Sequence, residues 1–228
     1  MTDGEGKPMT GGQVLGGRWR PLQYFFQQSV YADVMATCGK GGLCYLKNDA
    51  SAAATYRVVV TEEPLQSTRG PSGAHSQFTT TIEMPPGPGA VQYFHLPETF
   101  DMGPDHVYFV ETSASDEQQQ QEPEPLSEHI SLHMAPKDLH TAKGVNVTLS
   151  VSAGIATVSN AGAVGAALYV TLTTQAQGRF AENCFLLRAG EARRVAFVPA
   201  GGAASMLGHE QQRLLESTTR VEHLGMYL

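Results

Sequence analysis

Residues 77–84 have the sequence Gln-Phe-Thr-Thr-Thr-Ile-Glu-Met, in which apolar and polar side chains alternate. Because successive side chains of a strand point to opposite faces, this period of two predicts a half-buried β-strand. Residues 55–61, TYRVVVT, are rich in β-branched side chains and predict a strand just before it. The segment PPGPG at 85–89 must turn the chain. Strands separated by turns are therefore the local pattern around this stretch.

The same pattern extends in both directions along the chain. Turn signals recur at roughly 8–12-residue spacing, which is typical of β-sandwiches. The segment 214–228 is compatible with helix or strand, and β-branching at 218–224 favours strand. We predict an all-β chain with one sandwich at 33–135 and a second at 136–228. The further predicted strands are 33–38, 43–47, 91–96, 106–111, 129–134, 145–151, 154–159, 166–173, 183–187 and 191–197.

Residues 113–125 interrupt this series. They contain four glutamines, several acids and two prolines, and almost no apolar surface. Such a segment cannot offset the entropy of ordering by burial, so we predict a disordered acidic and glutamine-rich loop. It is either an exposed loop between two strands or a linker.

One amphipathic helix is predicted near the start, at 18–31, after a leader. Apolar side chains recur there at spacings of three and four, and Pro21 suits the first helical turn. An exposed apolar face of this size forgoes on the order of 1.5–3 kcal/mol per side chain. We therefore expect the helix to fold back onto the first sandwich or to pair with a second copy. The predicted packing residues are Trp19, Leu22, Phe25 and Phe26.

The bulk composition limits the partners of the chain. It has 228 residues, 41% of them hydrophobic, and a formal net charge of −7. A negative surface repels polyanions, which argues against nucleic acid as a partner. No apolar run approaches the roughly 20 residues of a membrane span. The first residues lack the apolar region of a secretory signal, so the expected location is cytoplasmic, or lysosomal or secreted if a longer parent carries a signal.

Three cysteines are too few for a disulfide framework. Cys38 and Cys44 flank a glycine-rich turn and can face each other on adjacent strands, but we interpret them as small hydrophobic side chains in a reducing compartment. Cys184 has no histidine or acid at a spacing that indicates chemistry. Asn146-Val147-Thr148 is a glycosylation sequon, which is used only in a secreted protein.

No arrangement of acids or histidines indicates catalysis or metal binding. Acids such as Glu62 and Glu63 lie in no recognised catalytic motif, and we expect them at the surface. His129 and His133 are four residues apart, but on a strand they stand too far apart to share one ion. We interpret them as surface histidines, and we expect no catalytic residue, metal or cofactor.

Four strings, taken in order, resemble the C-terminal part of a β-mannosidase of the glycoside hydrolase family 2 type. They span about 17–197. The first is similar to the last helix of that family's catalytic (β/α)₈ barrel, the second to a strand that opens an immunoglobulin-like domain, the third to a bridge between domains and the fourth to a strand and turn of the terminal domain. The strings are GRWRPLQYF at 17–25, CYLKND at 44–49, APKDL at 135–139 and GRFAENCFLLRAGE at 178–191.

The resemblance implies two immunoglobulin-like sandwiches, preceded by a helix left from the barrel. In that family the acid/base lies in an Asn-Glu pair of the barrel, and this sequence has no Asn-Glu dipeptide. The implied role is therefore accessory. The domains would support the catalytic barrel of a parent enzyme that hydrolyses terminal non-reducing β-mannose residues, and the chain alone would be inactive.

Two other classes of function stay open. A carbohydrate-binding module would use exposed aromatic side chains to stack on sugar rings, such as those of a β-mannoside glycan. Core packing competes for the same side chains, because they lie in alternating strands. A structural protein would associate through the helix face, for example with a second copy. The candidate sugar-binding residues are Tyr93, Phe94, Tyr108 and Tyr169.

Overall fold

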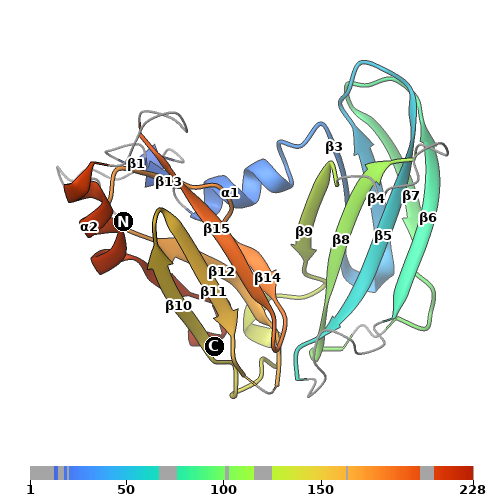
Figure 1. Cartoon of the computed structure of the whole chain (residues 1–228). Coiled ribbons are helices and arrows are strands. Elements are labelled where there is room, and N and C mark those ends of the chain that lie inside the picture. The colour runs from blue at the N-terminus through green and yellow to red at the C-terminus, as the bar shows by residue number, and fades with distance from the viewer. Residues whose placement is uncertain are drawn as a thin grey trace. The chain divides into compact units, whose positions relative to one another are not determined.

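The computed structural model describes residues 13–14, 18–19, 21–66, 76–100, 103–115, 125–162, 164–200 and 208–227. The chain divides into two compact units, each built around β-sheets (Figure 1). The N-terminal sandwich contains 26–67 and 72–142, and the C-terminal sandwich contains 1–25, 68–71 and 143–228. The division falls at 142/143 rather than at 135/136. The described residues among 13–25 group with the C-terminal sandwich, although the N-terminal sandwich follows them in the chain.

Two antiparallel sheets form the N-terminal sandwich. Val34, Leu46, Val58, Val60 and Val110 are among the buried residues that pack together in its core. The sheet orders are β3-β4-β7 and β6-β5-β8-β9. Their strands are β3 (Val34–Cys38), β4 (Leu43–Asn48), β5 (Ala54–Pro64), β6 (Gln77–Met84), β7 (Ala90–His95), β8 (His106–Ala114) and β9 (Ser127–Ser131), with short 3₁₀ turns η1 (Lys40–Gly42) and η2 (Pro136–Asp138).

Hydroxyl groups join the two sheets along β3. The Ser131 Oγ accepts a hydrogen bond from Cys38 N at 3.1 Å and donates one to the Cys38 carbonyl. Ala36 N donates to the Thr112 Oγ1 at 3.1 Å. These bonds satisfy backbone groups that an edge strand would otherwise leave unpaired.

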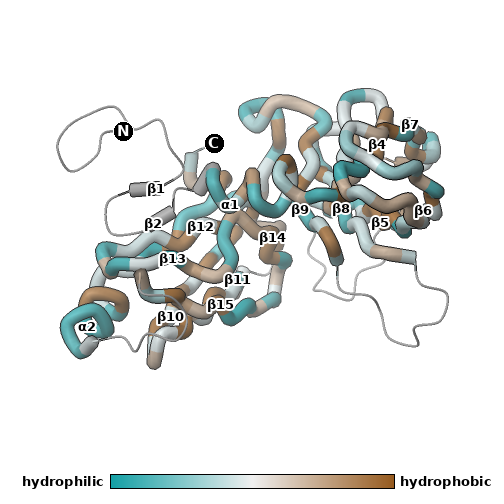
Figure 2. The backbone as a smooth tube through the Cα atoms, turned by 90° about the horizontal axis from the view of Figure 1, so that it is seen from above, coloured by the Kyte–Doolittle hydropathy of each residue, from teal (hydrophilic) through white to brown (hydrophobic). Residues whose placement is uncertain are grey.

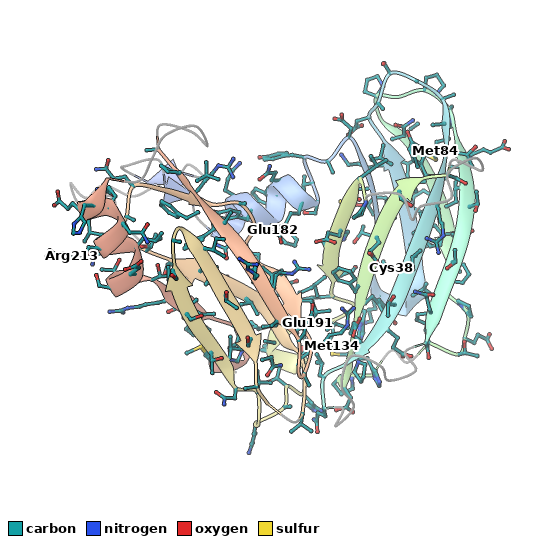
Figure 3. The ribbon with its side chains drawn as sticks, in the orientation of Figure 1. Cys38, Met84, Met134, Glu182, Glu191 and Arg213 are labelled. Atoms are coloured by element: carbon teal, nitrogen blue, oxygen red, sulfur yellow. A yellow bond between two sulfur atoms is a disulfide. The ribbon has the colours of Figure 1, made fainter. Side chains whose placement is uncertain are left out.

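A disulfide bond links Cys38 of β3 to Cys44 of β4. Figure 3 labels Cys38 on β3. The two residues are directly opposite in the antiparallel register and both are buried. The positive φ angles of Gly41 and Gly42 close the intervening turn tightly enough to align them. The expectation of two unbonded cysteines is therefore wrong, because spacing alone does not reveal this register.

The segment after β8 is a loop between neighbouring strands. β8 pairs antiparallel with β9, so residues 115–126 connect adjacent strands of one sheet. This resolves the choice between loop and linker in favour of a loop. The acidic and glutamine-rich residues 116–124 lie outside the described residues.

The C-terminal sandwich is also built from antiparallel sheets. Their orders are β10-β11-β15-β13 and β14-β12-β16, with a small pair β1-β2. Figure 2 shows that helix α2 is largely hydrophilic, but its Leu215 is fully buried in the core. The elements are β1 (Gln13–Val14), β2 (Arg18–Trp19), β10 (Val147–Ser152), β11 (Ile155–Asn160), β12 (Ala167–Thr173), β13 (Gly178–Phe180), β14 (Phe185–Leu187), β15 (Ala192–Pro199), α2 (His209–Thr218), β16 (Arg220–Glu222) and η3 (Leu224–Met226).

The helices differ in extent from the prediction. Helix α1 covers only Pro21–Gln28, and Trp19 lies in strand β2 instead. A proline at the first helical position favours a start there. The segment 214–228, which was compatible with helix or strand, contains both: the end of helix α2 and strand β16. The all-β fold class is confirmed. The described helices include none long and apolar enough to cross a membrane.

Buried asparagines fix loops in both sandwiches. The Asn48 amide donates to the carbonyls of Ala52 and Pro85, at 3.2 and 2.9 Å. The Asn160 amide likewise donates to Gly165 O at 2.9 Å. Asn183 makes two bonds to the backbone of Leu172, accepting from its N at 2.6 Å and donating to its O at 2.8 Å.

Candidate binding surface

Two tyrosines form an aromatic pair on the outward face of the β3-β4-β7 sheet. Tyr45 and Tyr93 are opposite each other in the β4-β7 register, and their ring centroids are 6.3 Å apart. Tyr93 is 69% exposed, and Tyr45 is half-buried. Tyr45 was not among the predicted residues. The alternation of Cys44, Tyr45 and Leu46, together with the hairpin register, is the signal that would have found it.

Apolar and charged neighbours extend this pair. Leu43 and Val91 lie two positions from Tyr45 and Tyr93 on the same side of their strands, and they are 43% and 45% exposed. Lys47, opposite Val91, donates from Nζ to Asp49 Oδ2 at 2.6 Å. We call Leu43, Tyr45, Lys47, Val91 and Tyr93 the tyrosine face.

Electrostatics at one end of the tyrosine face are defined by the Lys47–Asp49 pair. The hydrogen bond from Lys47 lowers the pKa of the Asp49 carboxyl, and the Gly89 N–H, which donates to Asp49 at 3.0 Å, acts in the same direction. Lys47 also donates to the Val30 carbonyl at 3.0 Å. Aromatic rings beside fixed polar groups suit a ligand that has both apolar faces and hydroxyl groups.

Two other candidate sugar-binding aromatic residues, Tyr108 and Phe94, are less exposed to solvent than Tyr93. Tyr108 is fully buried, with its ring near Phe100 and His133, so its proposal as a sugar-binding residue is corrected to core packing. Phe94 is half-buried and stacks on Phe78. Side chains on alternate positions of a strand enter the core, which is why Phe94 and Tyr93 differ.

Tyr169 contacts helix α1 within the C-terminal sandwich. Its ring lies edge-on to Phe25, with centroids 6.2 Å apart. Next to Phe25, Tyr24 is buried, and its hydroxyl oxygen accepts a hydrogen bond from Phe180 N at 3.0 Å. Burial raises the pKa of Tyr24 to about 12. The start of the helix is thus bound by β12 and β13.

This contact changes the expectation for the helix. It was expected to fold back onto the first sandwich or to pair with a second copy, but Tyr24 and Phe25 pack within the C-terminal sandwich. Phe26 instead belongs to the N-terminal sandwich, where its ring lies 5.5 Å from that of Tyr31. The side chains of Trp19 and Leu22 lie outside the described residues.

His129 and His133 are buried rather than exposed, which corrects the prediction of surface histidines. His129 Nε2 lies 3.2 Å from Thr37 Oγ1, and His133 Nε2 donates to the Gly103 carbonyl at 2.9 Å. Desolvation lowers the pKa of His129 to about 4. Both side chains therefore make their contacts inside the N-terminal sandwich. The described part of the chain holds no group of three or more histidine, cysteine or acidic side chains arranged to bind a metal.

Glu62 and Glu63 also differ from the prediction of solvated surface acids. Both lie inside strand β5 and are buried, at 7% and 1% exposure. Adjacent residues of a strand point to opposite faces, so their carboxyl groups are directed apart rather than toward one substrate. The paired geometry of a glycosidase requires two carboxyl groups that flank one bond.

Comparison with known proteins relates this fold to mannosidases. Residues 141–224 match the family Ig_mannosidase, described as an Ig-fold domain. The chain also resembles the β-D-mannosidase from Dictyoglomus thermophilum in structure, with a TM-score of 0.53 and 14% sequence identity. The resemblance to the C-terminal region of a β-mannosidase is confirmed. The match covers 90% of this chain but only 23% of that enzyme, so the chain spans less than a quarter of its relative.

A second structural comparison carries less weight. A chain of a chaperone–tip adhesin complex of CFA/I fimbriae matches over 84% of this chain and 98% of its own length, at 11% identity and a TM-score of 0.28. A score that low supports no argument about fold or function. No curated protein matches the sequence.

Proposed function

We propose that this chain is the accessory C-terminal region of a glycoside hydrolase family 2 β-mannosidase, and that it has no hydrolase activity alone. The observation that carries the proposal is the agreement between the Ig_mannosidase match at 141–224 and the structural likeness to a β-D-mannosidase over 90% of this chain. The parent enzyme would hydrolyse terminal non-reducing β-mannose residues. Its catalytic barrel would be the partner of these sandwiches.

Three of the four sequence strings, the first, second and fourth, support this role through the contacts they make. Asn48, in the second string, pins the loop after β4. Asn183, in the fourth, binds the backbone of Leu172 and also interacts with the Tyr24 side chain of the first string. In this proposal α1 is the last helix of the barrel, and its contacts with the terminal domain would fix the position of the accessory domains relative to the barrel.

The test of inactivity is direct. The purified chain is incubated with an aryl β-mannoside, and release of the aryl alcohol is compared with a heat-denatured control. We expect no difference. Turnover above the control that persists after further purification, and is lost in parallel with folding, would overturn the proposal.

A second candidate function is carbohydrate binding at the tyrosine face. The specific observation in its favour is the exposed Tyr93 paired with Tyr45, beside the apolar Val91 and the charged Lys47. Aromatic rings in such pairs offer flat apolar surface, and the neighbouring ammonium group can donate to hydroxyl oxygens. The ligand class would be a β-mannoside glycan.

Calorimetric titration with mannobiose tests this second function. Tyr93→Ala should abolish the heat of binding, and Tyr45→Ala should weaken it. Tyr227→Ala is a matched control, because Tyr227 is 68% exposed and lies in the other sandwich. Equal binding by the Tyr93 and Tyr227 variants, or no binding by the unmodified chain, would exclude the tyrosine face as a sugar site.

A further inference from the structure

The four asparagines of the chain divide into two kinds. Asn48, Asn160 and Asn183 are fully buried, and each side-chain amide bonds to backbone groups. Asn146 is exposed, and only its backbone carbonyl has a described role, accepting from Ala161 N at 2.8 Å. Three asparagines therefore stabilise loops, while the fourth presents its side chain to solvent without a structural task.

The exposed asparagine is also the one in a glycosylation sequon. The only Asn-X-Ser/Thr sequence of the chain is Asn146-Val147-Thr148, and its middle residue is not proline. Thr148 is exposed as well, and its hydroxyl donates to the Ser159 carbonyl at 3.3 Å. Both sequon side chains that matter are thus on the surface, so a folded chain could carry a glycan there without losing core contacts.

An independent observation indicates the compartment. Cys38 and Cys44 form a disulfide inside the core of the N-terminal sandwich. Disulfide bonds persist in oxidising compartments, and these include the secretory pathway, in which sequons receive N-linked glycans. The disulfide and the sequon lie in different sandwiches, so neither explains the other.

The location of Asn146 suggests what a glycan would do. It immediately precedes β10, which is an edge strand of its sheet among the described strands. The sequence of β10, VTLSVS, has no charge and no proline, and an uncharged edge strand is a template for pairing with another chain. A bulky hydrophilic group at the start of this strand would obstruct such pairing.

We propose that Asn146 is the acceptor of an N-linked glycan when the chain matures in the secretory pathway, and that this glycan shields the edge strand β10. The proposal is independent of the mannosidase-like role. It requires only the accessible sequon, the edge strand and the oxidising environment recorded by the disulfide.

Glycan attachment is tested by expressing the full chain behind a cleavable secretion leader in cultured animal cells. We expect one mobility shift on treatment with peptide N-glycosidase, with Asn146 converted to Asp in the corresponding peptide. Asn146→Gln and Thr148→Ala should abolish the shift, while Thr148→Ser, which keeps the sequon, should retain it. Secretion of the unmodified chain at its unglycosylated mass, or a shift that survives Asn146→Gln, would overturn the proposal.

Shielding is tested by size-exclusion chromatography of the secreted proteins. The glycosylated chain should elute as a monomer, and the enzymatically deglycosylated chain should move to earlier volumes as concentration rises. Ser150→Lys, which adds a charge to an outward position of β10, should restore the monomer after deglycosylation. Deglycosylation of folded protein avoids any dependence on whether a variant folds. An unchanged elution volume after complete deglycosylation would overturn the shielding role.

Discussion

The two sandwiches share a β-sheet architecture but are held together in different ways. In the N-terminal sandwich, a disulfide and the Ser131 hydroxyl tie strand β3 to its neighbours. In the C-terminal sandwich, Cys184 is buried and lies outside the disulfide, and the sandwich binds Tyr24 from a chain segment that precedes the other unit. The N-terminal sandwich is stabilised by a covalent bond between two of its own strands. The C-terminal sandwich is instead stabilised by a segment that is distant in sequence. Substitutions should therefore affect the two units separately.

The largest expected effect concerns Asn183 in the C-terminal sandwich. Asn183→Ala leaves both the N–H and the carbonyl of buried Leu172 without their partner, at about 1–3 kcal/mol for each group. We expect a loss of about 2–6 kcal/mol of unfolding free energy, confined to this unit. Hydrogen exchange of peptides from both units, in urea, measures this, with Asn146→Ala as the matched control. Equal deprotection of both units would contradict their independence.

A pH-dependent effect is expected in the N-terminal sandwich, at His129. Burial lowers the pKa of His129 to about 4, while an unfolded histidine has a value near 6.5. Above pH 6.5 both states are neutral, so His129 adds no pH dependence. As pH falls from 6.5 to 4, the unfolded state binds the proton first, and up to about 3 kcal/mol of unfolding free energy is lost.

His129→Gln should remove this part of the acid sensitivity. The measurement is urea unfolding at neutral pH and near pH 4.5, comparing the difference between the two conditions in each protein. His95→Gln is the matched substitution at an exposed position. If the variant and the unmodified chain lose the same free energy on acidification, the buried neutral histidine is not the cause.

Much of this architecture could be predicted from local patterns, because alternation records which side of a strand is buried. Strand β6 was predicted at its observed bounds, and Tyr93 was placed among the aromatics of β7. The burial of Glu63 and His129 could not be predicted, because charge and polarity normally indicate the surface. The bond from Phe180 N to Tyr24 joins residues 156 positions apart, and no local period reports such a contact.

The third effect concerns the disulfide of the N-terminal sandwich. Closing a loop of this length stabilises a protein by about 2–3 kcal/mol in the chain-entropy model. The double variant Cys38→Ala/Cys44→Ala should lose about that much in the N-terminal unit. Hydrogen exchange of peptides from the two units measures this loss, and Cys184→Ala is the control in the C-terminal unit. A thiol count of three in the denatured, unreduced protein would show that the bond does not form.

The smallest effect tests the distant segment that the C-terminal sandwich binds. Tyr24→Phe keeps the buried ring but removes the oxygen that accepts from Phe180 N, which costs about 1–3 kcal/mol for the unsatisfied donor. Cys184 is the cysteine outside the Cys38–Cys44 disulfide, and its burial makes its rate of reaction with a thiol reagent a measure of opening in this unit. In the Tyr24→Phe variant, Cys184 should be labelled faster by roughly 5- to 150-fold, the ratio that corresponds to this range of free energies.

The control is Tyr31→Phe, at an exposed position of the N-terminal sandwich, in which Cys184 should be labelled at the rate of the unmodified chain. Equal labelling rates for both variants would mean that the C-terminal sandwich stays closed without the hydrogen bond to Tyr24. The segment around Tyr24 would then bind to this sandwich without stabilising it.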